Sequence, residues 1–266
     1  MNPLSITLYV ADNCLQLIEN IPLDRFQITL SETPKFADIS MEFLTHKHSE
    51  EPLLSLKAKN SGAVNIDFIY GKTAHRRQFG GGKNQPLVRA MGSECQTILD
   101  ATAGMGNDGF VLANMGFQVT LCERNPFVQA LLKDALDRAQ QASDLPTELK
   151  SAIEHMSLIT KDSADFLNQD CHPGQFDCIY MDPMYPEKKK KAATNKEMTL
   201  LQTLAGPDLD SEQLLDAAIN IAKQRVIVKR PKNAPVIASK HWLPSTEISS
   251  PKTRYDIYVL KALKKR

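Results

Sequence analysis

The sequence predicts an α/β protein in which a Rossmann-like, doubly wound, mainly parallel sheet follows a small antiparallel β unit at the N-terminus. Two observations predict this fold class. Up to about residue 70, short segments alternate apolar and polar residues, which is typical of half-buried strands in an antiparallel sheet. From about residue 95, short apolar runs alternate with helical segments, and strands separated by helices pair in parallel.

The expected division of the chain follows this change of pattern. Residues 1–73 form a small β-rich unit, 74–94 a basic, glycine-rich linker with a short helix, and 95–266 the Rossmann-like domain. A chain of 266 residues that is 42% hydrophobic and 24% charged has the composition of a globular enzyme. Its net charge is only +1, so any binding to nucleic acid depends on local basic patches.

The N-terminal unit is expected to contain a hairpin. Residues Ile39–Phe43, Leu54–Lys57 and Val64–Phe68 each alternate apolar and polar side chains. The turn residues Asn60–Gly62 lie between the second and third of these segments. We therefore expect the last two segments to pair as neighbouring antiparallel strands.

Strands and helices alternate through the second region. The expected strands are Thr97–Asp100, Val119–Cys122, Ser157–Thr160, Phe176–Met181, Arg225–Lys229 and Tyr255–Leu260. The expected helices are Asp108–Met115, Pro126–Gln141 and Ser211–Lys223. Pro126 suits the first turn of its helix, and Ser211 is a candidate N-cap.

A glycine loop follows the first of these strands. Asp100 ends the strand, and Gly104 and Gly106 let the backbone turn tightly and approach a ligand closely. Glu123 ends the next strand, where a carboxylate accepts hydrogen bonds from ribose hydroxyls. Gly109 completes the spacing of a dinucleotide fingerprint, so the loop fits nicotinamide cofactors as well as S-adenosylmethionine.

A second motif, Asp182-Pro-Met-Tyr185, follows the strand Phe176–Met181. It resembles the Asp/Asn-Pro-Pro-aromatic motif of methyltransferases that act on planar amines, with Met184 in place of the second proline. The lone pair of such an amine is delocalised into its ring, and two acceptors at its protons favour the pyramidal, nucleophilic form. We expect the Asp182 carboxylate and the Pro183 carbonyl to be these acceptors, and Tyr185 to stack on the base.

Three more polar residues are candidate cofactor contacts. Asp162 and Ser163 follow the third strand, where class I methyltransferases bind the adenine ring. A helix N-cap is an equally open interpretation of Asp162. Asp108 could receive the ammonium group of the methionine moiety or cap its own helix.

The motifs together resemble one family, the bacterial ribosomal RNA small subunit methyltransferase J. The resemblance covers roughly residues 64–258 and rests on 74–82, 100–108, 123–126, 181–186, 206–210, 228–231 and 254–258. It implies a class I methyltransferase fold, S-adenosylmethionine as cofactor, the N2 amine of a specific guanine in 16S rRNA as target, and a cytoplasmic enzyme. The implied cofactor contacts are Asn107, Asp108, Glu123, Arg124, Asp162, Ser163 and Asp182, beside Asp100, Gly104 and Gly106 of the loop.

Three basic patches are candidate contacts to RNA phosphates, in 16S rRNA, the small ribosomal subunit or its precursor. They are the lysine run Lys188, Lys189 and Lys190, the linker residues His75, Arg76, Arg77 and Lys83, and the strand end Lys229 and Arg230. No membrane contact is expected, because no apolar stretch is long enough to span a bilayer. No metal is expected either, because the histidines and cysteines lack zinc-like spacing.

Other functions fit parts of the same pattern. The acceptor motif suits adenine, cytosine or a protein glutamine as well as guanine, because each presents a planar amine. A nicotinamide-dependent oxidoreductase could use the loop and Glu123, and Tyr185 to Lys189 has the spacing of a Tyr-x-x-x-Lys pair. A non-catalytic RNA-binding protein would not need the Asp182-Pro183 pair that this chain retains.

Overall fold

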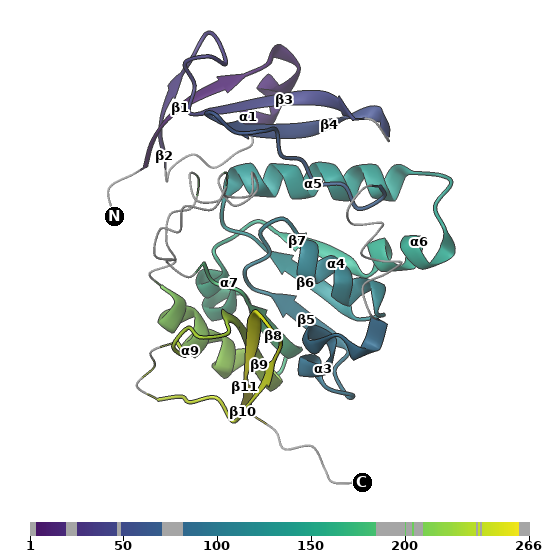
Figure 1. The fold of residues 1–266 in the computed structure, drawn as a ribbon, viewed down its shortest axis with the longest axis vertical. Helices are drawn as coiled ribbons and strands as arrows, with labels where there is room; N and C mark the ends of the chain where they lie inside the picture. Colours follow the sequence, from purple (N-terminus) through teal and green to yellow (C-terminus); the bar gives the residue numbers. More distant parts are fainter. Residues whose placement is uncertain are drawn as a thin grey trace. The chain divides into compact units, whose positions relative to one another are not determined.

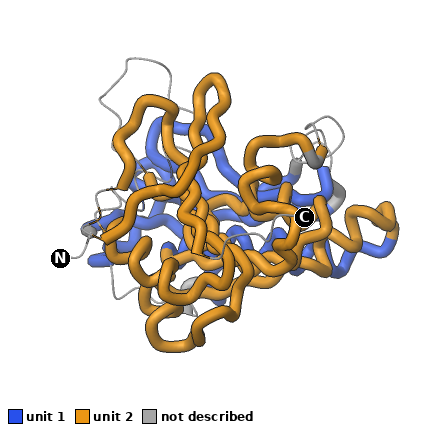
Figure 2. Tube along the Cα trace, turned by 90° about the horizontal axis from the view of Figure 1, so that it is seen from below, with its two compact units in different colours: residues 1–74, 125–143, 188–206 blue, residues 75–124, 144–187, 207–266 orange. Residues whose placement is uncertain are grey.

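The computed structural model describes residues 4–19, 26–46, 49–70, 82–184, 200, 204, 210–237, 239 and 241–260. The chain forms two compact units (Figure 2). Unit 1 comprises Met1–Ala74, Asn125–Ser143 and Lys188–Gly206, and unit 2 comprises His75–Arg124, Asp144–Glu187 and Pro207–Arg266. The three-part division expected from the sequence runs continuously along the chain, whereas these two units are interleaved.

Unit 1 contains a four-stranded sheet in the order β2-β1-β3-β4 (Figure 1). Its strands and short helices are β1 Leu4–Val10, η1 Asp12–Cys14, α1 Leu15–Glu19, β2 Phe26–Leu30, β3 Ile39–His46 and β4 Ser49–Ala58. β1 runs parallel to both β2 and β3, and only β3 and β4 pair antiparallel. The expectation of an antiparallel unit is therefore wrong for two of the three pairings, because alternation identifies a two-faced strand without fixing its direction.

The expected strand over Val64–Phe68 does not form. A single antiparallel bridge joins Leu56 to Val64, and Asn60 has a φ of +60° in the turn between them. Val64, Ile66 and Phe68 are nevertheless buried. The apolar alternation therefore predicted burial correctly, although the segment does not extend the sheet.

Helix α5, Pro126–Gln141, packs within unit 1. Asp134 accepts a hydrogen bond from the backbone N–H of Leu54 in β4, at 3.3 Å, and pairs with Arg138 one turn along the helix. Arg138 in turn donates to the carbonyl of Ile66, at 2.6 Å. These bonds attach α5 to the N-terminal sheet and to the segment that follows it.

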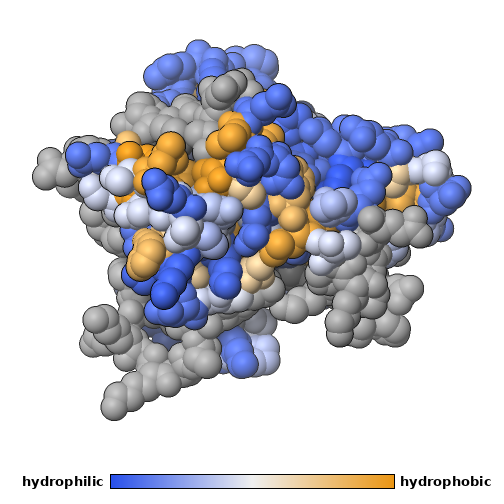
Figure 3. Space-filling model, turned by 90° about the horizontal axis from the view of Figure 1, so that it is seen from above, coloured by the Kyte–Doolittle hydropathy of each residue, from blue (hydrophilic) through white to orange (hydrophobic). Residues whose placement is uncertain are grey.

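Exposed hydrophobic side chains of unit 1 include Leu15, Leu30 and Phe36, each at least half exposed. Figure 3 shows one face of the molecule, on which hydrophobic surface is broken into patches by hydrophilic side chains. Patches of this kind are ordinary on a folded protein and do not by themselves indicate a partner.

Unit 2 contains a seven-stranded sheet in the order β10-β11-β9-β8-β5-β6-β7. Its strands are β5 Thr97–Asp100, β6 Gln118–Cys122, β7 Met156–Ile159, β8 Phe176–Met181, β9 Ala222–Pro231, β10 Thr246–Ser249 and β11 Thr253–Val259. β5 to β9 pair in parallel, and β11 is antiparallel to both of its neighbours. The predicted α/β fold with a mainly parallel sheet is confirmed.

Helices cover both faces of this sheet (Figure 1). The helices of unit 2 are η2 Gly82–Asn84, α3 Pro86–Met91, α4 Asn107–Asn114, α6 Thr147–Glu154, α7 Ser163–Gln169 and α9 Ser211–Ile221. Buried side chains of α7 and α9 join one core cluster with Leu99, Ile179 and Val228. Because side chains alternate along a strand, the opposite face carries Tyr180 and Lys229, which meet α4.

The expected helix Ser211–Lys223 begins at Ser211, but Ser211 is not its N-cap. The capping position is Asp210, whose side chain makes no cap hydrogen bond. The sequence pattern did not identify α6, α7 or β10 as elements. Within the described part of the chain, no helix is long and apolar enough to cross a membrane.

The order of the strands determines where a ligand can bind. From the central strand β5 the chain moves to β6 and β7 on one side, and later to β8 and β9 on the other. In open parallel sheets, ligands bind beyond the carboxyl ends of the strands at the point where this direction reverses. The loops that follow β5 and β8 meet at that point.

Gly109, in α4, provides a test of the packing that positions the first loop. A Cβ at this position would collide with the Leu121 side chain of β6 and lie 3.4 Å from Oδ2 of Asp100. We expect Gly109→Val to lower the free energy of unfolding by about 1–3 kcal/mol, because the helix must move away from the sheet. Urea unfolding of the full chain measures this loss. Asn114→Ala, at the end of the same helix, is the control, and an equal loss in both variants would contradict the packing argument.

Candidate active site

The glycine loop lies between β5 and α4 and leaves space for a ligand. Gly104 and Gly106 have φ angles of +52° and +70°, a conformation that favours glycine. A Cβ at Gly104 would meet only the carbonyl oxygen of Thr102, at 3.9 Å. Gly106 precedes α4 as its N-cap residue without a capping side chain. The loop therefore has the open backbone that close approach of a cofactor requires.

Glu123 connects this loop to the end of β6. Its Oε2 accepts a hydrogen bond from the N–H of Gly104, at 2.8 Å, and the residue is buried. A buried carboxylate next to an open glycine loop is the acceptor expected for the two hydroxyls of a ribose. The residues of the loop and Glu123 thus fit the cofactor that the sequence predicts.

The two polar residues after β7 have structural partners. Oδ1 of Asp162 accepts a hydrogen bond from the N–H of Ala164, at 3.0 Å, and so caps α7. Oγ of Ser163 donates to the carbonyl of Ala101, at 2.7 Å, and fixes the start of α7 to the loop after β5. The N-cap interpretation of Asp162 is confirmed, and contact with an adenine ring remains a prediction for both residues.

Arg124 joins the same edge of the sheet through ion pairs. Its Nη1 lies 2.6 Å from Oδ2 of Asp210 and 3.8 Å from Oδ2 of Asp162. The first-turn residue Asn107 of α4 is exposed. Contact with the cofactor therefore remains a prediction for both Arg124 and Asn107.

The second motif contacts the first directly. The N–H of Asp182 donates to Oγ1 of Thr102, at 2.6 Å, and the N–H of Ala101 donates to the carbonyl of Tyr180, at 2.8 Å. Pro183 is buried next to Asp182. The structure therefore brings the acceptor motif and the glycine loop together at one edge of the sheet, as the proposed chemistry requires.

A lysine connects the two motifs through their carboxylates. Nζ of Lys229, near the end of β9, lies 2.7 Å from Oδ2 of Asp108 and 2.8 Å from Oδ2 of Asp182. The hydroxyl of Tyr180 donates to the same oxygen of Asp108, at 2.7 Å. The N-cap position of α4 is Gly106, and the carboxylate of Asp108 in the first turn is held by a lysine and a tyrosine from two neighbouring strands.

Burial and mutual repulsion set the ionisation of these acids. Burial, followed by repulsion from Asp108, raises the pKa of Asp100 from 3.8 to about 8. Burial also raises the pKa of Asp182, although Lys229 opposes this shift. Burial lowers the pKa of Lys229, but Asp182 and Asp108 outweigh that effect and raise it overall. The ammonium of Lys229, between the carboxyl groups of Asp108 and Asp182, is thus the main influence that opposes the effect of burial on Asp182.

Two predicted RNA contacts have other partners in the structure. Lys229 pairs with carboxylates of the site, as described above. Arg230 is only 6% exposed, and its guanidinium donates twice to the carbonyl of Pro235, at 3.2 and 3.1 Å. A contact between Arg230 and a phosphate remains a prediction, and it requires the guanidinium to become accessible from solvent. The position of Arg230 at the end of a strand was correct, but its side chain points into the protein.

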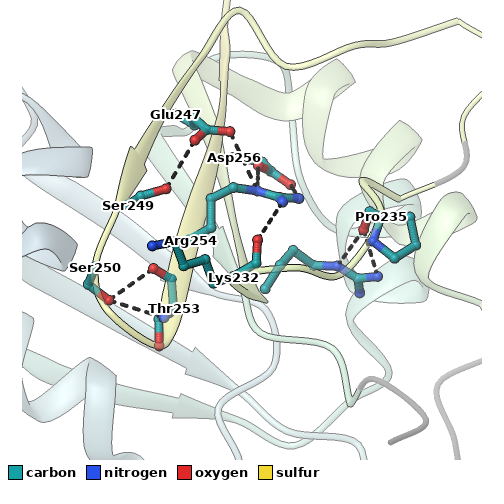
Figure 4. A network of polar contacts seen from close by, with 9 residues as sticks. Lys232, Pro235, Glu247, Ser249, Ser250, Thr253, Arg254 and Asp256 are labelled. Atoms are coloured by element: carbon teal, nitrogen blue, oxygen red, sulfur yellow. Dashed lines mark hydrogen bonds and ion pairs between the residues drawn. The ribbon is translucent and has the colours of Figure 1, made fainter.

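Arginines also fix the segment that follows β9 (Figure 4). Arg254 of β11 forms two bonds with the buried carboxylate of Asp256, at 2.6 and 3.0 Å, and donates to the carbonyl of Lys232, at 3.0 Å. Together with the bond from Arg230 to Pro235, this contact holds the chain beyond Pro231. The end of β9, and with it the backbone at Lys229, is therefore firmly positioned.

Several predicted residues cannot be placed. His75, Arg76, Arg77, Tyr185, Lys188, Lys189 and Lys190 lie outside the described residues, and Lys83 lies in η2 with its side chain undescribed. Among the described residues, no three His, Cys, Asp or Glu side chains are grouped as ligands for a metal ion.

The sequence analysis missed Thr102 and Tyr180 as parts of the site. A usable signal was present for both. Tyr180 lies two residues before Asp182 on a strand, so the two residues share a face. Thr102 lies two residues after Asp100, where the backbone leaves the strand, and Oδ1 of Asp100 accepts a hydrogen bond from its N–H.

The ionisation of Asp100 provides a test of this electrostatic picture. Its folded-state pKa lies above its unfolded value, so the stabilisation is complete below about pH 4 and is lost as the pH rises through about 8. Asp100→Asn retains an acceptor for Thr102 but cannot ionise. We expect the melting temperature of the variant, relative to the unchanged protein, to rise by at least about 2 °C between pH 5 and pH 8.5. Calorimetry across this range measures the difference, and a constant difference would contradict the raised pKa.

Comparisons with known proteins agree with this site. The chain matches a family model described as "Putative SAM-dependent methyltransferase" over residues 25–260. It is 52% identical over 220 residues to a ribosomal RNA small subunit methyltransferase J from Hydrogenovibrio crunogenus, covering 82% of this chain and 78% of the relative. It is 42% identical over 245 residues to the protein of the same name from Aeromonas salmonicida, covering 89% and 91%.

A solved structure supports the same assignment. The fold resembles the crystal structure of a SAM-dependent methyltransferase from Neisseria gonorrhoeae, with a TM-score of 0.67, 26% identity and 95% of each chain covered. The family resemblance noted in the sequence is thus confirmed over most of the chain. The chain belongs to the ribosomal RNA small subunit methyltransferase J family of S-adenosylmethionine-dependent methyltransferases.

Proposed function

We propose that this protein transfers a methyl group from S-adenosylmethionine to the exocyclic N2 amine of a specific guanine in 16S rRNA. Its curated relatives carry the name ribosomal RNA small subunit methyltransferase J, which supports small-subunit rRNA as the substrate. The choice of guanine rests on the family resemblance, because the acceptor chemistry suits other planar amines equally. A cytoplasmic site of action follows from this substrate.

One observation carries the chemical part of the proposal. Asp182 follows β8, its backbone binds the loop after β5, and its side chain is 39% exposed. The carboxylate is therefore anchored beside the cofactor loop and still reachable by a substrate. An acceptor in that position is what the amine needs next to an activated methyl group.

The reaction can be assigned to groups of this chain. S-adenosylmethionine supplies, when bound, a methyl group activated by its sulfonium. The carboxylate of Asp182 and the carbonyl of Pro183 accept hydrogen bonds from the two N–H groups of the amine and favour the pyramidal nitrogen. The nitrogen lone pair forms the new N–C bond as the C–S bond breaks, and sulfur retains that electron pair. The nitrogen then loses one proton, which Asp182 can accept and pass to water.

The binding of RNA is assigned to basic residues outside this pocket. His75, Arg76, Arg77, Lys83, Lys188, Lys189 and Lys190 remain our candidates for phosphate contacts, and Tyr185 for stacking on the base. This part of the proposal rests on charge and on position in the sequence. The net charge of +1 makes such local patches necessary for binding to rRNA.

The target base is tested by direct analysis of the product. Small subunits from a strain lacking the corresponding gene are incubated with the purified protein and isotopically labelled S-adenosylmethionine. Nucleoside mass spectrometry then identifies the methylated base. We expect N2-methylguanosine at one position of 16S rRNA. Detection of N6-methyladenosine or N4-methylcytidine instead would show that the target base is adenine or cytosine.

We expect Asp182→Ala to lower the rate of methyl transfer by at least about 100-fold, because it removes an acceptor that acts on the reacting amine. Binding of S-adenosylhomocysteine, measured by calorimetry, should remain largely unchanged. Asp170→Ala is the matched control, because that carboxylate pairs with Lys161 on the surface of the same unit. Methyl transfer at the unchanged rate in Asp182→Ala would refute the proposed acceptor.

Glu123→Gln tests the cofactor contact separately. The glutamine carbonyl can still accept the N–H of Gly104, but the charged acceptor for the ribose is lost. We expect affinity for S-adenosylhomocysteine to fall by about 10- to 100-fold. Glu154→Gln, at the exposed end of α6, is the control. Equal affinity in the two variants would remove Glu123 from the cofactor site.

A further inference from the structure

Lys229 lies between two carboxylates of the candidate active site. Its ammonium lies within 2.8 Å of both Asp108, in the first turn of α4, and Asp182, directly after β8. The Lys229 side chain is 26% exposed, against 39% for Asp182 and 13% for Asp108. The side chain of Lys229 is therefore less exposed than that of Asp182.

We propose that Lys229 is a positioning residue for methyl transfer: its ammonium, bridged to Asp108, keeps the carboxylate of Asp182 ionised and oriented toward the amine. This inference rests on the proposed function and extends it. Nothing in the acceptor motif itself supplies this cation, because Lys229 comes from a different strand. The lysine acts on the substrate only through Asp182.

The first argument is electrostatic. Two partly buried carboxylates that share a site repel each other, and one of them then takes up a proton. A cation between them removes this repulsion and lets both stay charged. Burial raises the pKa of Asp182, and Lys229 is the largest of the influences that lower it.

Among the described residues, several charged or titratable groups influence Asp182. They include Asp100 of β5, Asp108 of α4, Tyr180 of β8, and Lys229 and Arg230 of β9. Asp108 raises the pKa of Asp182, and Arg230 lowers it less than Lys229 does. Loss of Lys229 therefore leaves the repulsion from Asp108 largely unopposed.

The second argument is chemical. An ionised Asp182 accepts a hydrogen bond from the amine, whereas the protonated carboxyl group has lost that acceptor oxygen and presents a donor. Only the ionised form can also take up the proton that the methylated nitrogen releases. The charge of Lys229 therefore decides over which pH range Asp182 can act.

The third argument is geometric. Lys229 shares a sheet face with Tyr180, and both bind Oδ2 of Asp108, at 2.7 Å each. The neighbouring Arg230 is anchored to the carbonyl of Pro235, so the strand end cannot shift easily. The ammonium of Lys229 is thus held in one position, where it can orient the Asp182 carboxylate.

The test compares Lys229→Met and Lys229→Arg with Lys223→Met. Lys223 lies on the same strand and pairs with Asp177 at 3.4 Å, so it is a matched lysine outside the site. In the full-length protein labelled with ¹³C-aspartate, NMR titration gives the midpoint of the Asp182 carboxyl, assigned with Asp182→Asn. The pH dependence of methyl transfer on small subunits is measured in parallel.

We expect Lys229→Met to raise the carboxyl midpoint by at least about one pH unit. The acid limb of the activity profile should move by the same amount. Lys229→Arg should keep the original midpoint, because the guanidinium remains charged, even where its rate is lower. Lys223→Met should change neither quantity. Should Lys229→Met fail to fold, Lys229→Gln makes the same comparison with an N–H donor but no charge.

Three outcomes would overturn the inference: a carboxyl midpoint that does not move in Lys229→Met, an equal shift in Lys229→Arg, or an effect confined to RNA affinity. In the last case the affinity would lose salt dependence, as expected when a phosphate contact is removed. Absence of methyl transfer by the unchanged protein would refute the proposed function instead. The NMR titration would still test Lys229 in that case, because it does not depend on turnover.

Discussion

The parallel pairing of β5 with β8 is the constraint on which the site depends. Asp100 stands opposite Tyr180 in this register, so the two strands end together and their following loops leave the sheet side by side. Gly106 of the glycine loop and Asp182 are 76 residues apart in the sequence. The backbone N–H of Asp182 nevertheless donates a hydrogen bond to Thr102 in the loop after β5. Reversal of the chain direction at this point leaves no helix between the two loops, and the edge remains available to a ligand.

The same closeness creates an electrostatic problem that the fold must solve. Asp100, Asp108 and Asp182 lie close enough to influence one another, and their site is partly shielded from water. Asp100 has a pKa of about 8 and is mostly protonated at neutral pH, while the other two share the ammonium of Lys229. The acceptor can be placed beside the cofactor loop because its neighbours are neutralised in these two ways.

Sequence periodicity predicted the central part of this fold closely, and its failures have physical causes. The predicted bounds of β5, β8 and α5 agree with the structure, because the two strands are short apolar runs and the helix has an apolar periodicity with Pro126 in its first turn. The expected antiparallel arrangement of the N-terminal unit fails at β1, which pairs in parallel with β2 and β3, because alternation carries no direction. Lys229 and Arg230 were correctly located at the end of a strand, but charge alone did not reveal that Lys229 pairs with two carboxylates or that Arg230 is buried. The nicotinamide alternative is no longer tenable for a member of this methyltransferase family.

The position of Lys229 shows what a motif leaves undetermined. Asp182-Pro183 specifies where two acceptor oxygens lie, but an acceptor works only in the right protonation state, and that state is set by residues on other strands. Lys229 reaches the site because it shares its sheet face with Tyr180, two residues before Asp182 in an adjacent strand. A serine or glutamine at position 229 would leave the motif intact and the backbone unchanged, yet the carboxylate would face Asp108 without a cation between them. The chemistry of the motif therefore depends on the register between β8 and β9 as much as on its own residues.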